Sequence, residues 1–285
     1  MSKNSTRSNT SATGTTNGSG RSGKPTKREA RESARERLAQ QRVRDKQIQA
    51  RRRKAMIGAA VVTVVALAAG IAVAATSGGK SAASGPLVIP AKTTGPNGTV
   101  IVYGNANAKH TLDVWEDFRC PICDKLEKAD GPTIQQLADN GTYKIQYHMA
   151  TFLDRNLGGT GSMDALEVAG AALNDGGVAK FKAFHDVLYA NQPEETTDGF
   201  GNLNTLLDLA KKVPGLVTPT FTKDVQDRVY APWAQKVTDA FNSSGVTGTP
   251  TLKLDGKALT VFDSQGNAIT PAQYTAFVQQ TVAGK

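Results

Sequence analysis

The 285-residue chain contains only two cysteines, Cys120 and Cys123, three positions apart in the stretch DFRCPICDK. On a helix such residues share one face with Cβ atoms about 5–6 Å apart, so a disulfide can form and open with little backbone movement. Pro121 fits the first helical position, where its missing N–H would have no partner. The pair is therefore predicted at the start of a helix running from Cys120 to about residue 138.

This placement makes Cys120 the N-cap residue. Its sulfur is expected to face the amides of Ile122 and Cys123 and the positive end of the helix dipole, both of which favour a thiolate. Arg119 is expected to add to this effect. Since the thiolate is the reactive form of cysteine, Cys120 is the predicted nucleophile, and Cys123, one turn inside the helix, is the predicted resolving thiol.

Two other uses of the cysteines fit less well. A disulfide closing so short a loop would stabilise the fold by only about 2 kcal/mol, which a domain of this size hardly needs. A structural zinc site usually takes four ligands, and the three histidines, His110, His148 and His185, lie far apart in the sequence. We therefore expect no metal and no cofactor, and His185 fits a buried core position.

Charge is distributed unevenly along the chain. Residues 1–55 hold 16 Lys and Arg and 4 Asp and Glu, a net charge of +12 within an overall +9, so the remaining residues carry −3. The basic isoelectric point describes this tail and gives no support for nucleic-acid binding by the rest of the chain. The Ser, Thr, Asn and Gly content of residues 2–23 predicts disorder.

An uncharged apolar run, residues 56–76, follows the basic tail. A helix of about 20 residues spans the roughly 30 Å hydrocarbon core of a bilayer, so the run predicts a single transmembrane helix. The RRRK sequence at 51–54 predicts a cytoplasmic N-terminal tail and an extracytoplasmic body, where conditions are oxidising. A cleaved secretory signal is the alternative, because residues 72–74 offer a small-x-small site, although signal sequences have shorter apolar regions.

Residues 77–98 are rich in Ser, Gly, Ala and Pro and predict a flexible linker. The body, residues 99–285, is expected to be one α/β domain. Strands are predicted at 99–104, 112–118 and 143–149, and the helix between the last two makes a parallel βαβ unit. Gly131-Pro132 is expected to kink or interrupt that helix.

The second half of the body alternates between helical and strand patterns. Apolar residues at helical spacing predict a helical insertion over about 160–243. Asp255-Gly256 predicts a β-hairpin, and Thr270 with Gln273 predicts a capping box at the start of a last helix. The residues expected to bury one face of that helix are Tyr274, Phe277, Val278 and Val282.

The stretches DVWEDFRCPICDKLE, FHDVLYANQPE and GVTGTPTLKLDG together resemble the DsbA-like thiol:disulfide oxidoreductases of the thioredoxin superfamily. The resemblance covers nearly all of residues 85–285 and implies a thioredoxin-like fold with a helical insertion. It also implies that Thr249-Pro250 is cis and lies against the cysteine pair. The backbone of Thr249 would then pair with an extended substrate segment.

The sequence departs from the family at two places. The family often has an acid six residues before the nucleophilic cysteine, where this chain has Val114. Glu116 or Asp117 could take its place, and strand alternation puts only Glu116 on the same face as Val114. The intervening dipeptide is Pro121-Ile122, without the histidine found in strongly oxidising relatives. The sequence therefore does not determine how strongly oxidising the pair is.

These features predict a membrane-anchored, extracytoplasmic dithiol oxidase that forms disulfides in exported proteins. Its expected partners are cysteine-containing exported substrates and, by the resemblance, a quinone-linked membrane protein that reoxidises the pair. A disulfide reductase or isomerase is the alternative with the same chemistry. A non-enzymatic binding or chaperone-like module is the alternative of another class.

Overall fold

The computed structural model describes residues 85–284. The predicted tail at 1–55, the predicted span at 56–76 and residues 77–84 lie outside this range. Among the described residues, no helix is both long and apolar enough to cross a bilayer.

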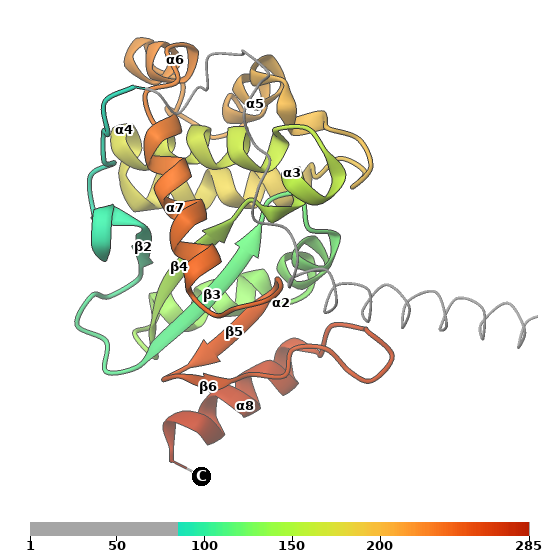
Figure 1. The fold of residues 1–285 in the computed structure, drawn as a ribbon. Coiled ribbons are helices and arrows are strands. Elements are labelled where there is room, and N and C mark those ends of the chain that lie inside the picture. Colours follow the sequence, from blue (N-terminus) through green and yellow to red (C-terminus); the bar gives the residue numbers. More distant parts are fainter. Residues whose placement is uncertain (1–84, 285) are drawn as a thin grey trace, which may run out of the picture. The chain divides into compact units, whose positions relative to one another are not determined.

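A six-stranded sheet forms the centre of the fold, with strand order β1-β2-β4-β3-β5-β6 (Figure 1). Strands β3 and β4 are parallel and joined by helix α2, as the βαβ pattern predicts, and the other neighbouring pairs are antiparallel. The strands are β1 (Thr93–Thr94), β2 (Val100–Tyr103), β3 (Thr111–Asp117), β4 (Lys144–Ala150), β5 (Thr251–Leu254) and β6 (Lys257–Ala258).

The predicted helical insertion joins β4 to β5. Its longest helix, α4, bends where Gly177 takes a non-helical conformation with φ 71°, a backbone region that glycine enters without steric cost. The helices of the insertion are α3 (Phe152–Leu157), α4 (Gly161–Ala190), α5 (Leu203–Ala210), α6 (Pro219–Gln226) and α7 (Ala231–Ser243), with a short 3₁₀ turn, η3 (Gly199–Gly201).

Helices cover both faces of the sheet. Helix α7 lies across β3 and β4 on one face, and α2 (Pro121–Asp139) lies on the other (Figure 1). Helix α2 continues through Pro132, so the predicted interruption does not occur. It also packs against α4 and against the last helix, α8 (Pro271–Val282).

The C-terminal elements follow the prediction with one correction. Asp255 and Gly256 form the turn between β5 and β6, both with positive φ, and Thr270 and Gln273 form the capping box of α8. Tyr274 and Val278 are buried, but Phe277 is 40% exposed. Helix α8 therefore buries a narrower stripe than predicted, because it packs against α2 at the margin of the fold and has few other neighbours.

The C-terminal part of the predicted linker is structured. Strand β1 pairs with β2, and η2 (Pro96–Gly98) follows it. The indole Nε1 of Trp233 donates to the carbonyl of Gly98 at 2.8 Å, and the amide of Ala91 donates to Asn174. The domain therefore begins before residue 99, because these backbone contacts tie the segment to α4 and α7.

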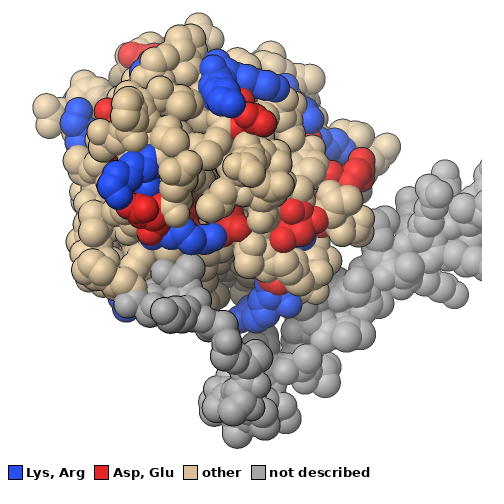
Figure 2. All heavy atoms as spheres, turned by 90° about the horizontal axis from the view of Figure 1, so that it is seen from above, with Lys and Arg blue, Asp and Glu red and all other residues tan. Residues whose placement is uncertain are grey.

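Basic and acidic side chains are interspersed on the face seen in Figure 2, without one extended patch of either sign. This pattern agrees with the small net charge expected for the body, and the face in view has no extended basic surface of the kind that binds a polyanion.

Candidate redox-active site

Strand β3 and helix α2 place the cysteine pair. The strand ends at Asp117, a turn closed by the Cys120 amide and the Asp117 carbonyl at 2.9 Å follows, and α2 begins at Pro121. Cys120 is the N-cap, with the extended backbone expected there (φ −75°, ψ 114°). The βαβ unit thus places both thiols at the carboxyl end of β3.

The two cysteines differ in exposure. Both are free thiols; Cys120 is 6% exposed and Cys123 is fully buried. Ile122, between them, is 47% exposed and is one of the most exposed apolar residues of the domain. A substrate can therefore approach only the Cys120 sulfur, along a surface that includes Ile122.

The Cys120 thiol is unusually acidic. A hydrogen bond from the Cys123 thiol does most to lower its pKa, against the opposing effect of burial, and the Thr249 hydroxyl and the amides of Cys123 and Ile122 lower it further. The pKa falls from 9.0 to about 7. Roughly half of the thiol is therefore ionised at pH 7, against about 1% for an unperturbed cysteine.

The N-cap argument predicted the direction of this shift but not its main cause. Among the described residues, no capping hydrogen bond of standard geometry reaches the Cys120 side chain, although the nearby amides still stabilise the thiolate. The larger contribution comes from Cys123, because the i to i+3 spacing that permits a disulfide also lets one thiol donate to the other.

The Cys123 thiol has the opposite character. Burial raises its pKa well above 9.0, and the nearby Cys120 and Glu116 add to the effect. Cys123 is therefore protonated at neutral pH and unreactive until Cys120 brings a partner sulfur to it. This contrast is the one expected between a nucleophile and a resolving thiol.

Thr249 and Pro250 lie against the pair, as the resemblance implies. Their peptide bond is cis, and the Cys120 Sγ donates to the Thr249 carbonyl at 3.5 Å. Within the described residues the buried Thr249 hydroxyl has no standard hydrogen-bond partner, so it can turn toward the Cys120 sulfur when that sulfur is ionised.

Arg119 does not face the thiolate, which corrects its predicted part in lowering the Cys120 pKa. Its guanidinium is buried and pairs with Asp154 at 2.7 Å and with Asp198 at 3.3 Å. Residue 119 lies in the turn before α2, and the carboxylates of Asp154 in α3 and Asp198 before η3 attract its side chain. Arg119 thus anchors the turn to the insertion.

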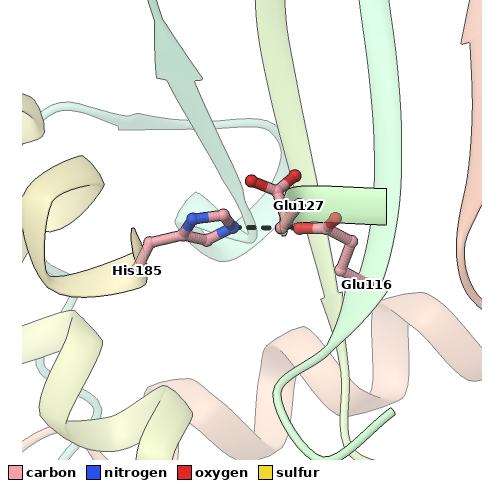
Figure 3. A group of neighbouring side chains, drawn as sticks. All are labelled: Glu116, Glu127 and His185. Atoms are coloured by element: carbon pink, nitrogen blue, oxygen red, sulfur yellow. Dashed lines mark hydrogen bonds and ion pairs between the residues drawn. The ribbon is translucent and has the colours of Figure 1, made fainter. Parts of the chain in front are cut away.

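Glu116 lies on the same face as Val114, as strand alternation predicts, and is fully buried. Its carboxylate pairs with Nε2 of His185 at 3.0 Å, and Glu127 of α2 points into the same space (Figure 3). The three residues come from β3, α2 and α4. His185 is a buried core histidine, as the sequence predicts, but it is also the cation of an ion pair.

The sequence did not identify Glu127 as a member of this group. Burial and the charge of Glu116 raise the pKa of Glu127 to about 8, so it is mostly neutral at pH 7. Burial lowers the pKa of His185, but hydrogen bonds with Asp186 and Glu116 outweigh it and raise the value to about 9. The helical pattern gave one sign of a buried polar cluster. It places Lys182 and His185 beside Phe181 and Phe184, which are buried.

The three side chains also have the chemistry of metal ligands, with one ligand atom each within 4.8 Å of the others. Protons and cations already balance their charges, however: His185 pairs with Glu116, and Lys182 lies close enough to lower the pKa of Glu127. His110 and His148 pair with Asp255 and Asp113 away from this group. A shared-proton cluster therefore accounts for the arrangement with the residues present.

A hollow of about 290 Å³ between α2 and α4 reaches this cluster from the surface. Its wall includes Glu127, Lys182 and Asp186. Water in this hollow can exchange protons with Glu127, which lies between the surface and the buried pair of Glu116 and His185.

A thioredoxin-like sheet, an acidic N-cap thiol and a cis proline beside it define a protein of thiol–disulfide exchange. Residues 96–280 match the family model described as Thioredoxin (Thioredoxin_4). The chain therefore belongs to the thioredoxin family.

Similar proteins include a disulfide bond formation protein and a disulfide bond oxidoreductase. The chain is 26% identical over 155 residues to "Probable disulfide bond formation protein D" of Bacillus cereus, covering 54% of this chain and 69% of the relative. The reduced disulfide bond oxidoreductase DsbG of Mycobacterium tuberculosis has 25% identity and a TM-score of 0.53 over 70% of this chain and 86% of its own. Oxidised DsbA of the same organism has 26% identity and a TM-score of 0.51, over 68% and 90%. These comparisons confirm the resemblance to DsbA-like oxidoreductases.

Proposed function

We propose that the chain is an extracytoplasmic thiol:disulfide oxidoreductase that works as a dithiol oxidase, forming disulfides in exported proteins through Cys120 and Cys123. The observation that carries this proposal is the contrast between the two thiols. The Cys120 pKa is lowered to about 7, and the Cys123 pKa is raised well above 9.0. A stabilised Cys120 thiolate favours the reduced form of the pair, which makes its disulfide an oxidant.

The reaction begins with the oxidised pair. A substrate thiolate attacks the Cys120 sulfur, the Cys120–Cys123 bond breaks, and a mixed disulfide joins the substrate to Cys120. The electron pair of the broken bond stays on Cys123, which takes up a proton because its pKa is high. Attack falls on Cys120 because Cys123 is fully buried.

A second substrate thiolate then attacks the substrate sulfur of the mixed disulfide. Cys120 leaves as a thiolate, the substrate gains a disulfide, and the pair has taken up two electrons. The low Cys120 pKa makes this thiolate a good leaving group. Both steps therefore depend on the groups that stabilise negative charge on Cys120.

Glu116 and its neighbours form the route by which Cys123 takes up its proton. The negative charge of Glu116 helps to hold Cys123 protonated, and Glu127 links Glu116 to the hollow between α2 and α4. Glu116 thus takes the place of the acid that the sequence lacks at Val114. Pro121 and Ile122 tune the same pair by starting α2 and by forming its exposed edge.

Thr249 and Pro250 form the substrate-binding element. Pro250 has no N–H to donate, and the Thr249 backbone next to the sulfur is placed to pair with an extended substrate segment. This arrangement holds a substrate cysteine over Cys120, and Ile122 contributes an apolar contact beside it.

The sequence supports the cellular setting of this activity. A tail at 1–55 lies in the cytoplasm, residues 56–76 anchor the chain in the membrane, and the domain works outside, tethered by the segment before residue 85. Cysteine-containing exported proteins are the substrates. A quinone-linked membrane protein accepts the two electrons and restores the disulfide.

The direction of the reaction is tested by equilibrating the domain with glutathione and by mixing the oxidised domain with a reduced, unfolded model substrate. We expect a reduction potential closer to about −120 mV than to about −270 mV and one substrate disulfide formed per oxidised pair. The Cys120→Ser variant is the control and should form none. A potential near about −270 mV would point to a reductase, and full biological activity of a Cys120→Ser, Cys123→Ser variant would point to a binding module.

A further inference from the structure

The side chain of Gln192, just beyond the end of α4, reaches the backbone of the active-site turn. Its Nε2 donates to the carbonyl of Phe118 at 2.9 Å and to the carbonyl of Cys120 at 3.0 Å. Both amide hydrogens of one side chain are therefore directed at the turn that carries the nucleophile, although the residues lie more than 70 positions apart in the sequence.

Other contacts from the insertion hold the beginning of the same turn. The Asp117 carboxylate accepts from the Ser162 hydroxyl at 2.6 Å and from the Leu153 amide at 3.2 Å, and the Tyr189 hydroxyl donates to the Asp117 carbonyl at 3.3 Å. These contacts fix the end of β3. Gln192 acts three residues further on, where the backbone of Cys120 itself is held.

The position of the Cys120 carbonyl helps to fix the Cα–Cβ bond from which its sulfur extends. That carbonyl also accepts the first hydrogen bond of α2, from the Asp124 amide at 3.1 Å. With the carbonyl held from two sides, the N-cap backbone has little freedom to rotate. The Cys120 sulfur is then kept near the start of the helix and beside Thr249, whose carbonyl is 3.5 Å away.

We infer that Gln192 is a positioning residue for the nucleophile, fixing the Cys120 backbone so that its sulfur stays between the start of α2 and Thr249. The inference rests on the proposed function only for the use that the chain makes of this thiol, since the positioning itself concerns the reactivity of Cys120 alone. The helical insertion thereby takes part in the chemistry: its α4 end sets the reactivity of a cysteine on another element.

The test compares the pH dependence of Cys120 alkylation in the reduced wild-type chain and in the Gln192→Met variant, which keeps an unbranched side chain and loses both donors. We expect the inflection to move up by about one unit, so that alkylation below pH 7 slows roughly tenfold. The matched control is Asn191→Ala. The Asn191 side chain is the neighbouring amide, but it donates to Val187 within α4 at 2.7 Å.

An unchanged inflection in a folded Gln192→Met variant would overturn the inference, and so would an equal shift in Asn191→Ala, which would indicate general loosening of the α4 end. If Gln192→Met does not fold, Gln192→Leu repeats the comparison with another neutral side chain that lacks both donors. The wild-type chain gives an independent measurement: the side-chain amide NMR signals of Gln192 should titrate with Cys120, and a lack of response counts against the inference. None of these results depends on whether the pair oxidises substrates.

Discussion

The Cys120 sulfur donates a hydrogen bond to the Thr249 carbonyl at 3.5 Å, across 129 positions of sequence. One residue caps the helix that follows β3, and the other precedes β5, the antiparallel neighbour of β3 in the sheet. The sheet thus brings the proposed nucleophile and the proposed substrate-binding backbone to one end of two adjacent strands. The same contact links the reactivity of the thiol to the residue that would hold its substrate.

The reactivity of Cys120 is expected to depend on pH as that of an acidic thiol does. Because the Cys120 pKa is lowered to about 7, the alkylation rate of the reduced chain should rise with pH and level off above about pH 8. The measurement is the rate of iodoacetamide labelling between pH 5 and 10, with Cys120→Ser as the blank. An inflection near 9 would contradict the assignment of Cys120 as the nucleophile.

Replacing Thr249 with valine should weaken the nucleophile while keeping the shape of the site. The Thr249 hydroxyl lowers the Cys120 pKa, so its loss should raise that pKa and slow alkylation below pH 7 by a few-fold, about what one neutral hydrogen bond contributes. Thr251→Val is the control, because that hydroxyl donates to the Gly248 carbonyl at 2.8 Å. Equal behaviour of the two variants would show that the hydroxyl does not act on the sulfur.

Removing the resolving thiol should have two effects. In Cys123→Ala the main group that lowers the Cys120 pKa is lost, so the pKa should rise from about 7 by more than in Thr249→Val. In this variant the Cys120 thiolate can still attack a disulfide of an exported protein, which forms a mixed disulfide and releases one substrate thiolate. Cys123 is then absent and cannot attack the Cys120 sulfur to resolve that bond, so complexes with exported proteins should accumulate. Non-reducing electrophoresis and mass spectrometry would identify them, and their absence in cells would weigh against thiol exchange with proteins.

The residues that the sequence located best are those fixed by local rules. Pro121 sets the start of α2, Asp255-Gly256 sets the hairpin, and Thr270 with Gln273 sets the last helix, because each acts through neighbours within four positions. Strand alternation also placed Glu116 on the inner face of β3. The resemblance, not the local rules, supplied the cis bond before Pro250.

Contacts between distant elements were not foreseen. Arg119 was expected to act on the adjacent thiolate, yet its guanidinium is drawn to Asp154 and Asp198, 35 and 79 positions later in the sequence. Gln192 and Glu127 gave no signal of their own, because their roles depend on which helix packs against the active-site turn. Periodicity predicts which face of a helix is buried, but not which groups meet there.

The buried histidine should give the fold a characteristic pH dependence. The His185 pKa is raised from 6.5 to about 9, so the folded state retains a proton that the unfolded chain releases. The stabilisation is fully present below about pH 6.5 and is lost as the pH rises toward about 9, at about 1.4 kcal/mol per unit of pKa difference. The measurement is urea unfolding from pH 6 to 9 for the reduced wild-type chain and for His185→Gln. The difference in free energy of unfolding between them should shrink as the pH rises, and a difference that stayed constant would contradict the ion pair.

The two buried glutamates should respond differently to the same substitution. Glu116 is the fully buried anionic partner of His185 at 3.0 Å, so Glu116→Gln leaves the buried cation with only the more exposed Asp186, at 3.2 Å, as its counter-ion and should cost on the order of 3 kcal/mol of stability at pH 7. Glu127, with a pKa raised to about 8, is mostly protonated at that pH, so the neutral amide of Glu127→Gln should change stability by less than about 1 kcal/mol. The two variants differ at one carboxyl each within one cluster and are matched controls for each other. A metal ion held by the cluster would need both carboxylates, so the two variants would then lose equal stability. That result, together with stoichiometric zinc or manganese in protein purified without chelators, would show a metal site in place of the shared proton.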